Sequence, residues 1–362
     1  MSYLDRNGHG QQQRHHRNLW FAPQVNPFFA GAVAVSMFAR TRAAFNAFFG
    51  FTSVLVPAVA APDPASASAH LPASLEQHVR AIASVEHNTA SPAALERSAR
   101  YIESRLAGFG YQVRRQEYKY DGHAVRNIEV SLVNTNGIKE PSRIIIVGAH
   151  YDSARGAPGA NDNGSGAAAL LELARMLKPT RLREGSELKF VFFVNEEPPY
   201  FLGDGMGSRR HAQDLRQRRQ PVEAAIILET IGYYTHAANS QRYPPGLEKI
   251  YPSTGNFIAF VGTTQSSDLV RNTLGAFRAS SDFPAHGLAA PASVAGVTLS
   301  DHTSYNRMGY PALMVTDTAF MRYPYYHTAQ DTPDKLDYSS LARVVQGLEK
   351  VVAGMVAPQA KD

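Results

Sequence analysis

The chain has 362 residues, 44% of them hydrophobic, which is enough for one large domain or two small ones with a substantial core. Its formal net charge is +5, but five arginines and one aspartate in residues 1–60 account for +4, and the near-neutral remainder excludes a nucleic-acid-binding body. The absence of cysteine excludes disulfide bonds, thiol catalysis and anchoring through a lipidated cysteine.

The N-terminal segment has the pattern of an export signal. Arg40 and Arg42 precede a mostly apolar segment, residues 43–61, in which Ala58-Val59-Ala60 forms a small-residue cleavage pattern. A basic region, an apolar region and such a cleavage site make up a secretory signal. We therefore expect residues 1–70 to be signal and disordered linker, residues 71–362 to be a single domain, and the mature protein to be periplasmic or extracellular.

Two alternatives for this segment stay open. Translation from Met37 instead of Met1 would give a compact signal, and an uncleaved segment 43–61 would leave the protein anchored in a membrane. No later apolar segment is long enough to cross a membrane, so we expect no membrane contact after cleavage.

Two helices and a hairpin are expected at the start of the domain. Apolar residues recur every three or four positions in residues 75–87 and 93–107, which predicts two helices. Residues 111–120 and 125–133 are expected to form two strands joined by a turn at Asp121-Gly122.

The next strand carries the first candidate site residues. The apolar run Ile144–Val147 is typical of a strand that is buried on both faces. His150 and Asp152 follow its carboxyl end, and Asp162 lies in the Gly- and Asn-rich loop after them. Open α/β sheets bind ligands outside the carboxyl ends of their strands, so these side chains are candidate metal ligands.

The rest of the chain alternates between strands and helices. Strands are expected at residues 188–194, 224–228, 257–261 and 311–316, and helices at residues 167–177, from 208, at 266–279 and at 338–356. Residues 280–310 are expected to form mostly a long loop. This alternation predicts a three-layer α/β/α fold with a mixed, mostly parallel central sheet.

More ionisable residues follow the later strands. Glu196 and Glu197 come after the strand at 188–194, Glu229 ends the next strand, and His327 lies in an aromatic loop after the last. Each alone is more often a turn former or a solvated side chain. Carboxylates gathered at one sheet edge repel one another unless a cation neutralises them. Imidazoles and carboxylates together suit two zinc ions, which predicts hydrolysis or aminolysis of an acyl bond with a nearby carboxylate as general base.

Six short motifs follow one another along the chain. They are GAHYDS at 148–153, NDNGSG at 161–166, NEE at 195–197, LETIGY at 228–233, SDH at 300–302 and YHTAQDT at 326–332. In these motifs the chain, from about Leu75 to its C-terminus, resembles the co-catalytic zinc aminopeptidase family, which also includes glutamate carboxypeptidases and glutaminyl cyclases. The resemblance implies a zinc-exopeptidase fold, a single catalytic domain at 71–362, and peptide substrates with a free N-terminus.

The resemblance also implies a role for each candidate residue. The expected ligands of two zinc ions per chain are His150 and Glu229 for the first ion, Glu197 and His327 for the second, and Asp162 as the bridge. Glu196 would be the general base, and Asp152 would orient the imidazole of His150. Glu229 stands where several family members carry aspartate, but its longer side chain still reaches a metal.

Other motif residues are candidates for the substrate pocket. The free amine would be held by acidic groups at its closed end. Candidates for its walls are Tyr233, Phe320, Tyr325 and Tyr326. Asp301, His302 and Asp331 are expected to support the pocket rather than bind metal, with Asp301 also a candidate for substrate contact.

Two other functions stay open at this point. A glutaminyl cyclase would use one zinc ion for intramolecular aminolysis, although His150 and Asp162 together favour two metals. A non-catalytic binding domain on the same fold would normally lack ligands or the base, whereas Glu196 and all five expected ligands are present. The sequence determines neither the oligomeric state nor the side-chain preference, and manganese or cobalt also suit these ligands.

Overall fold

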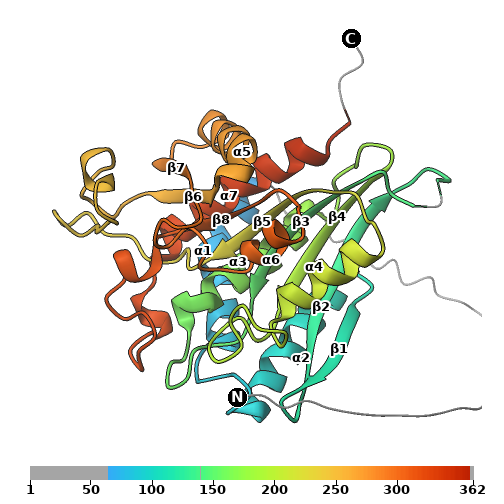
Figure 1. Ribbon diagram of the computed structural model, residues 1–362, viewed down its shortest axis with the longest axis horizontal. Coiled ribbons are helices and arrows are strands. Elements are labelled where there is room, and N and C mark those ends of the chain that lie inside the picture. The colour runs from blue at the N-terminus through green and yellow to red at the C-terminus, as the bar shows by residue number, and fades with distance from the viewer. Residues whose placement is uncertain (1–63, 139, 359–362) are drawn as a thin grey trace, which may run out of the picture. The chain divides into compact units, whose positions relative to one another are not determined.

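Eight strands form one mixed sheet in the part of the chain that the computed structural model describes, residues 64–138 and 140–358 (Figure 1). The strands are β1 (Arg114–Tyr120), β2 (His123–Asn134), β3 (Arg143–His150), β4 (Ser186–Phe193), β5 (Val222–Glu229), β6 (Ile258–Thr263), β7 (Ala285–Ala290) and β8 (Ala312–Thr316). Their order in the sheet is β1-β2-β4-β3-β5-β8-β6-β7. The four central strands β4, β3, β5 and β8 are parallel, and antiparallel pairing with β2 and β6 flanks them.

Helices cover both faces of this sheet. They are α1 (Pro64–Ile82), α2 (Pro92–Gly108), α3 (Gly166–Leu177), α4 (Gly207–Gln217), α5 (Ser267–Ser280), α6 (His302–Arg307) and α7 (Tyr338–Val356). On β3, Ile145 and Val147 pack in the core shared with α1, α2, α3, α5 and α7. Ile144 and Ile146 belong to the opposite core, shared with α4 and α6. Figure 1 shows the helices and the sheet that they cover. The predicted three-layer fold is confirmed, because strands buried on both faces alternate between two cores.

The carboxyl ends of the central strands meet at one edge of the sheet. His150 at the end of β3 pairs with Phe193 of β4, just before the two acids that follow that strand. Glu229 at the end of β5 pairs with Thr316 of β8. Gly148 allows the close packing here, since a Cβ on it would lie 2.5 Å from the ring of Phe193. The parallel register therefore brings together side chains that are far apart in sequence.

The first helix differs from the prediction at both ends. It begins at Pro64, so the domain boundary expected at residue 71 falls inside it, and it ends at Ile82 rather than at residue 87. Beyond the helix, His87 pairs with Ser153: the amide of His87 donates to Ser153 Oγ (3.0 Å) and the amide of Ser153 to the carbonyl of His87 (3.1 Å). This pairing braces the loop after β3.

The region expected to be a long loop contains a strand and a helix. Strand β7 is an edge strand of Ala, Gly, His and Leu without β-branched residues, and α6 is only six residues long. Both are too short or too weakly patterned for periodicity to detect. The predicted export signal lies outside the described residues, and within residues 64–138 and 140–358 no helix has both the length and the hydropathy needed to span a bilayer.

Candidate metal centre

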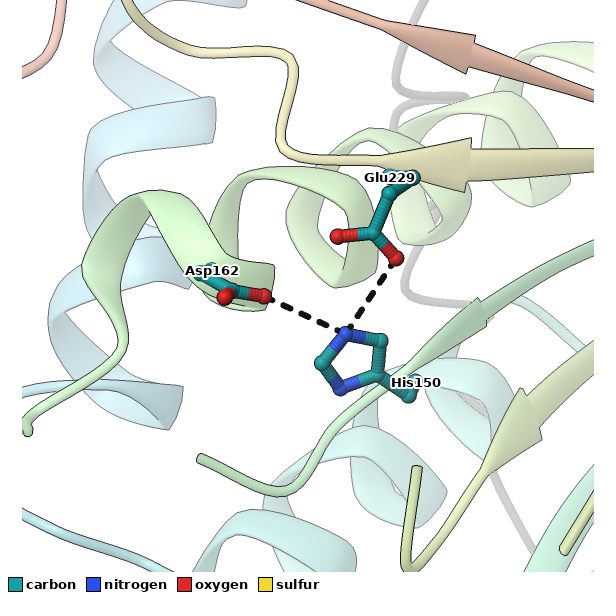
Figure 2. A group of neighbouring side chains, drawn as sticks. All are labelled: His150, Asp162 and Glu229. Carbon is teal, nitrogen blue, oxygen red and sulfur yellow. Dashed lines mark ion pairs between the residues drawn. The ribbon is translucent and has the colours of Figure 1, made fainter. Parts of the chain in front are cut away.

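Three predicted ligands converge at the end of β3. The Nε2 atom of His150 lies 3.3 Å from Asp162 Oδ1 and 3.4 Å from Glu229 Oε2, as Figure 2 shows. All three side chains are buried. Figure 2 also shows that they come from three different segments, with the imidazole pointing between the two carboxylates.

The second group of ligands shares Asp162 with the first. His327 Nε2 lies 3.0 Å from Asp162 Oδ2 and 3.1 Å from Glu197 Oε2. One oxygen of Asp162 thus faces His150 and the other faces His327, which is the arrangement that a bridging carboxylate needs. The imidazole of His327 is 34% exposed, so this side of the cluster opens to solvent.

The donor set fits bound cations. His150 Nε2, both carboxylate oxygens of Asp162 and Glu197 Oε1 are buried without a hydrogen-bond partner among the described residues. Buried polar atoms are normally paired, so four unpaired atoms in one cluster indicate a missing partner. Imidazole nitrogens and carboxylate oxygens are typical zinc ligands. Three trios of such atoms lie close enough together to hold an ion: His150-Asp162-Glu229, Asp162-Glu197-His327 and His150-Glu196-Glu197. The first two match the predicted ligand sets and share Asp162.

The shifted pKa values of the cluster also indicate a bound cation. Burial, reinforced by the charge of Asp162, raises the pKa of Glu197 to about 8. Burial also raises the pKa of Glu196 and of Glu229. The contacts of His327 with Asp162 and Glu197 outweigh its burial and raise its pKa to about 10. In the absence of a metal, the buried carboxylates repel one another, and a bound divalent cation would neutralise their negative charge.

Asp152 holds the two acids that follow β4. Its carboxylate accepts hydrogen bonds from the backbone amides of Glu196 (3.1 Å) and Glu197 (3.3 Å). Its carbonyl oxygen lies 3.1 Å, and its Oδ1 atom 3.6 Å, from the Nδ1 atom of His150. Asp152 therefore contacts the imidazole on the side away from the proposed metal and also sets the direction of the neighbouring glutamates.

The NDN motif places Asp162 by anchoring the residue on each side of it. Asn163 accepts the amide of Thr230 at Oδ1 (3.1 Å) and donates to the carbonyl of Leu228 (2.8 Å). Asn161 accepts the amide of Gly232 (2.8 Å). Both asparagines thus tie the turn to the exit of β5, so Asp162 between them is presented to the ligands at the same sheet edge.

Two more buried aspartates accept hydrogen bonds from residues of this turn. Asp331 accepts the amides of Asn161 (2.8 Å) and Asp162 (3.2 Å), in line with its expected supporting role. Asp317, which no sequence motif singled out, accepts Asn161 Nδ2 (2.9 Å) and the amide of Tyr233 (2.8 Å). Asp317 directly follows the end of β8. A search for acidic residues just after each predicted strand, which identified Glu196 and Glu197, would therefore have found it.

The predicted substrate-pocket residues fall into two groups. Tyr326 lines an apolar pocket together with Glu229 and Phe320, and its ring stacks on His327 with a centroid distance of 3.9 Å. Tyr233 and Tyr325, by contrast, pack on Tyr323, at 4.9 Å and 5.5 Å, and are not among the lining residues of that pocket.

The SDH motif lies behind the ligands. Ser300 donates a hydrogen bond to Glu229 Oε2 (2.7 Å). Asp301 is fully buried, neither of its carboxylate oxygens has a hydrogen-bond partner in the described part of the chain, and burial raises its pKa to about 7. His302 Nε2 lies 2.8 Å from the carbonyl of Val297. The motif thus positions one ligand and leaves one buried acid without a hydrogen bond.

Known proteins share extended sequence similarity with this chain. Uncharacterized protein YfbL of Escherichia coli (strain K12) is 39% identical over 288 residues, 76% of this chain and 86% of that protein. Leucine aminopeptidase 1 of Arthroderma otae is 28% identical over 235 residues, 61% of this chain and 55% of that protein. This chain therefore spans little more than half the length of the fungal relative.

Solved structures with low sequence identity share the fold. The LapA aminopeptidase of Legionella pneumophila has a TM-score of 0.64 at 20% identity, covering 82% of this chain and 75% of that one. BSAP, a zinc aminopeptidase from Bacillus subtilis, has a TM-score of 0.62 at 18% identity, covering 81% of this chain and 96% of that one. Fimbriiglobus ruber glutaminyl cyclase has a TM-score of 0.57 at 21% identity, covering 78% of this chain and 94% of that one.

The family assignment comes from the sequence itself. Residues 127–352 match peptidase family M28, and this range contains all five candidate ligands, from His150 to His327, as well as Glu196. The chain therefore belongs to peptidase family M28 and is a metal-dependent exopeptidase.

Proposed function

We propose that this chain is an aminopeptidase that removes N-terminal residues from peptides with two zinc ions per chain. The observation that carries the proposal is the placement of Asp162, whose two oxygens face two separate imidazoles at 3.3 Å and 3.0 Å. The similarity to the fungal leucine aminopeptidase supports the choice of substrate.

Two zinc ions held by the two trios that share Asp162 would polarise the scissile carbonyl and lower the pKa of an attacking water. Glu196 is the carboxylate left over for proton transfer. Its Oε2 atom lies 3.9 Å from His150 Nε2, farther than Asp162 and Glu229, so it is the least suited of the three to complete that ligand set. Glu196 takes the proton of the attacking water and passes it to the departing amine.

The chain's own residues also organise the substrate. Tyr326 stacks on the candidate ligand His327, and burial together with the charges of Asp162 and Glu229 raises the pKa of its phenol. The apolar pocket next to Glu229 receives the side chain of the first residue.

The test is metal analysis combined with an activity screen. We expect two zinc ions per chain and hydrolysis of aminoacyl p-nitroanilides, and we expect His327→Ala to retain less metal. Two zinc ions without hydrolysis of any aminoacyl substrate would overturn the proposal. One zinc ion per chain with cyclisation of N-terminal glutaminyl peptides would instead make the chain a glutaminyl cyclase.

A further inference from the structure

An apolar pocket lies beside Glu229, and its lining residues determine which substrate side chain it can accept. It runs between the sheet edge at β6, β7 and β8 and the segment around residues 243–251. Its apolar walls include Phe257, Val261, Leu288, Val297 and Met314. Because Glu229 is a candidate metal ligand, a side chain next to the scissile carbonyl would enter here. The substrate preference inferred for this pocket thus rests on the proposed aminopeptidase function.

Most polar groups that line this pocket are already occupied. The hydroxyls of Tyr243, Tyr251, Thr316 and Thr318 each hydrogen-bond to a backbone carbonyl or a neighbouring side chain. Glu229 accepts its bond from Ser300. Among the described residues, the side chains of this lining left without a hydrogen bond at their polar ends are Tyr326, beside the carboxylates, and His286 on β7.

The ring of His286 is held in place although its nitrogens make no hydrogen bond with the other described residues. His286 pairs with Ala259 in the parallel ladder of β6 and β7. Its imidazole lies edge-on to Phe257 (centroid distance 4.8 Å, interplanar angle 87°) and to Tyr251 (5.9 Å, 82°). Two such contacts fix the plane of the ring in the pocket wall.

The charge of the pocket limits what it can accept. Burial, together with the positive charges of Arg278 and Arg322, lowers the pKa of His286, so the imidazole is neutral at pH 7 with one donor and one acceptor nitrogen. Glu229 is the carboxylate in the lining, and it is committed to the ligand cluster. A lysine or arginine side chain would find no free counter-charge here.

We propose that His286 selects tyrosine as the first residue of the substrate by hydrogen-bonding to its phenolic hydroxyl. The aromatic side chains of the lining, including Phe257 and Tyr251, favour an aromatic ring by edge-to-face contacts. A neutral imidazole in an otherwise apolar wall then distinguishes a ring with a hydroxyl from one without it.

The test compares tyrosine and phenylalanine p-nitroanilides, which share the same leaving group and differ by one hydroxyl. The zinc-loaded wild-type enzyme should show a kcat/KM for the tyrosine substrate about fivefold higher, as one partly exposed hydrogen bond supplies. His286→Phe keeps an aromatic ring against Phe257 and Tyr251 but removes both nitrogens, so the ratio should fall to about one.

The matched control is Tyr251→Phe. It removes a lining hydroxyl that is committed to the carbonyl of Gly287 (2.7 Å), so the substrate ratio should stay at its wild-type value. Thermal unfolding checks that each variant is folded, and His286→Leu replaces His286→Phe if the latter is not.

Two results would overturn the inference. One is equal kcat/KM for the two substrates in the wild type, and the other is an undiminished preference for tyrosine after loss of the imidazole. Both leave the aminopeptidase assignment intact, because either substrate is still cleaved. Failure to hydrolyse any aminoacyl substrate would instead contradict the proposed function itself.

Discussion

Glu196 and Glu197 are neighbours in sequence, yet the structure gives their side chains different surroundings. Glu197 reaches His327 (3.1 Å), whereas Glu196 faces His150 at 3.9 Å. The carboxylate of Asp152 accepts hydrogen bonds from both of their backbone amides, so it fixes the backbone from which the two side chains extend. At the scale of the residue, Glu197 lies closer to its imidazole than Glu196 does, and the proposed mechanism assigns proton transfer to Glu196.

Glu196→Gln tests this division of roles. The amide keeps the shape of the side chain but cannot take a proton, so we expect kcat to fall by about 10²–10⁴ while bound zinc stays unchanged. Steady-state hydrolysis of leucine p-nitroanilide and metal analysis of the same sample measure the two effects. The exposed Glu184→Gln is the control and should alter neither. Wild-type activity in Glu196→Gln would show that the base is another group.

The shifted pKa values predict how the stability of the metal-free protein depends on pH. The folded-state pKa values of Glu197 (about 8) and His327 (about 10) lie above the ordinary values of 4.5 and 6.5. From pH 7 to 9 the folded state therefore holds more protons than the unfolded state. Stability from these groups is complete at low pH and is lost as pH rises through the folded values, by about 1.4 kcal/mol per pH unit for each extra proton.

Chemical denaturation of the chelator-treated protein at pH 7, 8 and 9 measures this decline. Zinc-loaded protein should show a weaker one, because zinc binds the deprotonated ligands and its stabilising effect grows with pH. A metal-free protein that became more stable over this interval would contradict the raised pKa values of Glu197 and His327.

At the scale of the element, the turn Ala160–Ser165 positions Asp162, the proposed bridging ligand. It is tied to the exit of β5 and to Asp331 through side-chain and backbone hydrogen bonds. The Gly- and Asn-rich composition predicted a loop here, and its ionisable residue was recognised from its position after β3. The partners of each asparagine lie on other elements, and no local pattern names them.

Asn163→Ala should loosen this turn. It leaves the amide of Thr230 and the carbonyl of Leu228 without their partner, so we expect a loss of about 1–3 kcal/mol of stability. Zinc affinity should fall about 10–100-fold, because Asp162 is no longer held. Denaturation and competition with a zinc chelator measure the two effects.

Asn134→Ala is the matched control for this variant. Asn134 donates to the carbonyl of Leu182 (2.7 Å) at the other end of the sheet, so its loss should lower stability without changing zinc affinity. Equal effects of the two variants on zinc would mean that Asn163 does not position the bridge.

Long and strongly patterned elements were predicted closely, and short ones were not. Helix α7 has the predicted bounds, Tyr338–Val356, because its apolar residues recur over five turns. Strand β7 was missed, since six residues of Ala, Gly, His and Leu become a strand only by pairing with β6. This missed strand carries His286, so the proposed specificity could not have been derived from periodicity.

At the scale of the whole molecule, we propose that the chain is exported and cleaved after Ala60. The support is the order of Arg40 and Arg42, the apolar segment and Ala58-Val59-Ala60. N-terminal sequencing of the protein recovered from the periplasm or medium should begin at Ala61, and Ala58→Leu should block cleavage. Recovery of the uncleaved chain in the membrane fraction would show instead that residues 43–61 are an anchor.

The sequence alone was enough to predict the fold class and the family of this protein, and it named the candidate ligands that the structure brings together. This was possible because each ligand follows a strand or a loop with a recognisable local pattern, and parallel strands bring their carboxyl ends to one edge. Only the tertiary structure decided which oxygen of Asp162 faces which imidazole and that Asp152 and Asp317 hold the surrounding backbone. It also placed His286 in the pocket wall without a hydrogen bond to any other described residue. These are contacts between segments far apart in the chain, and they depend on register and packing rather than on local periodicity.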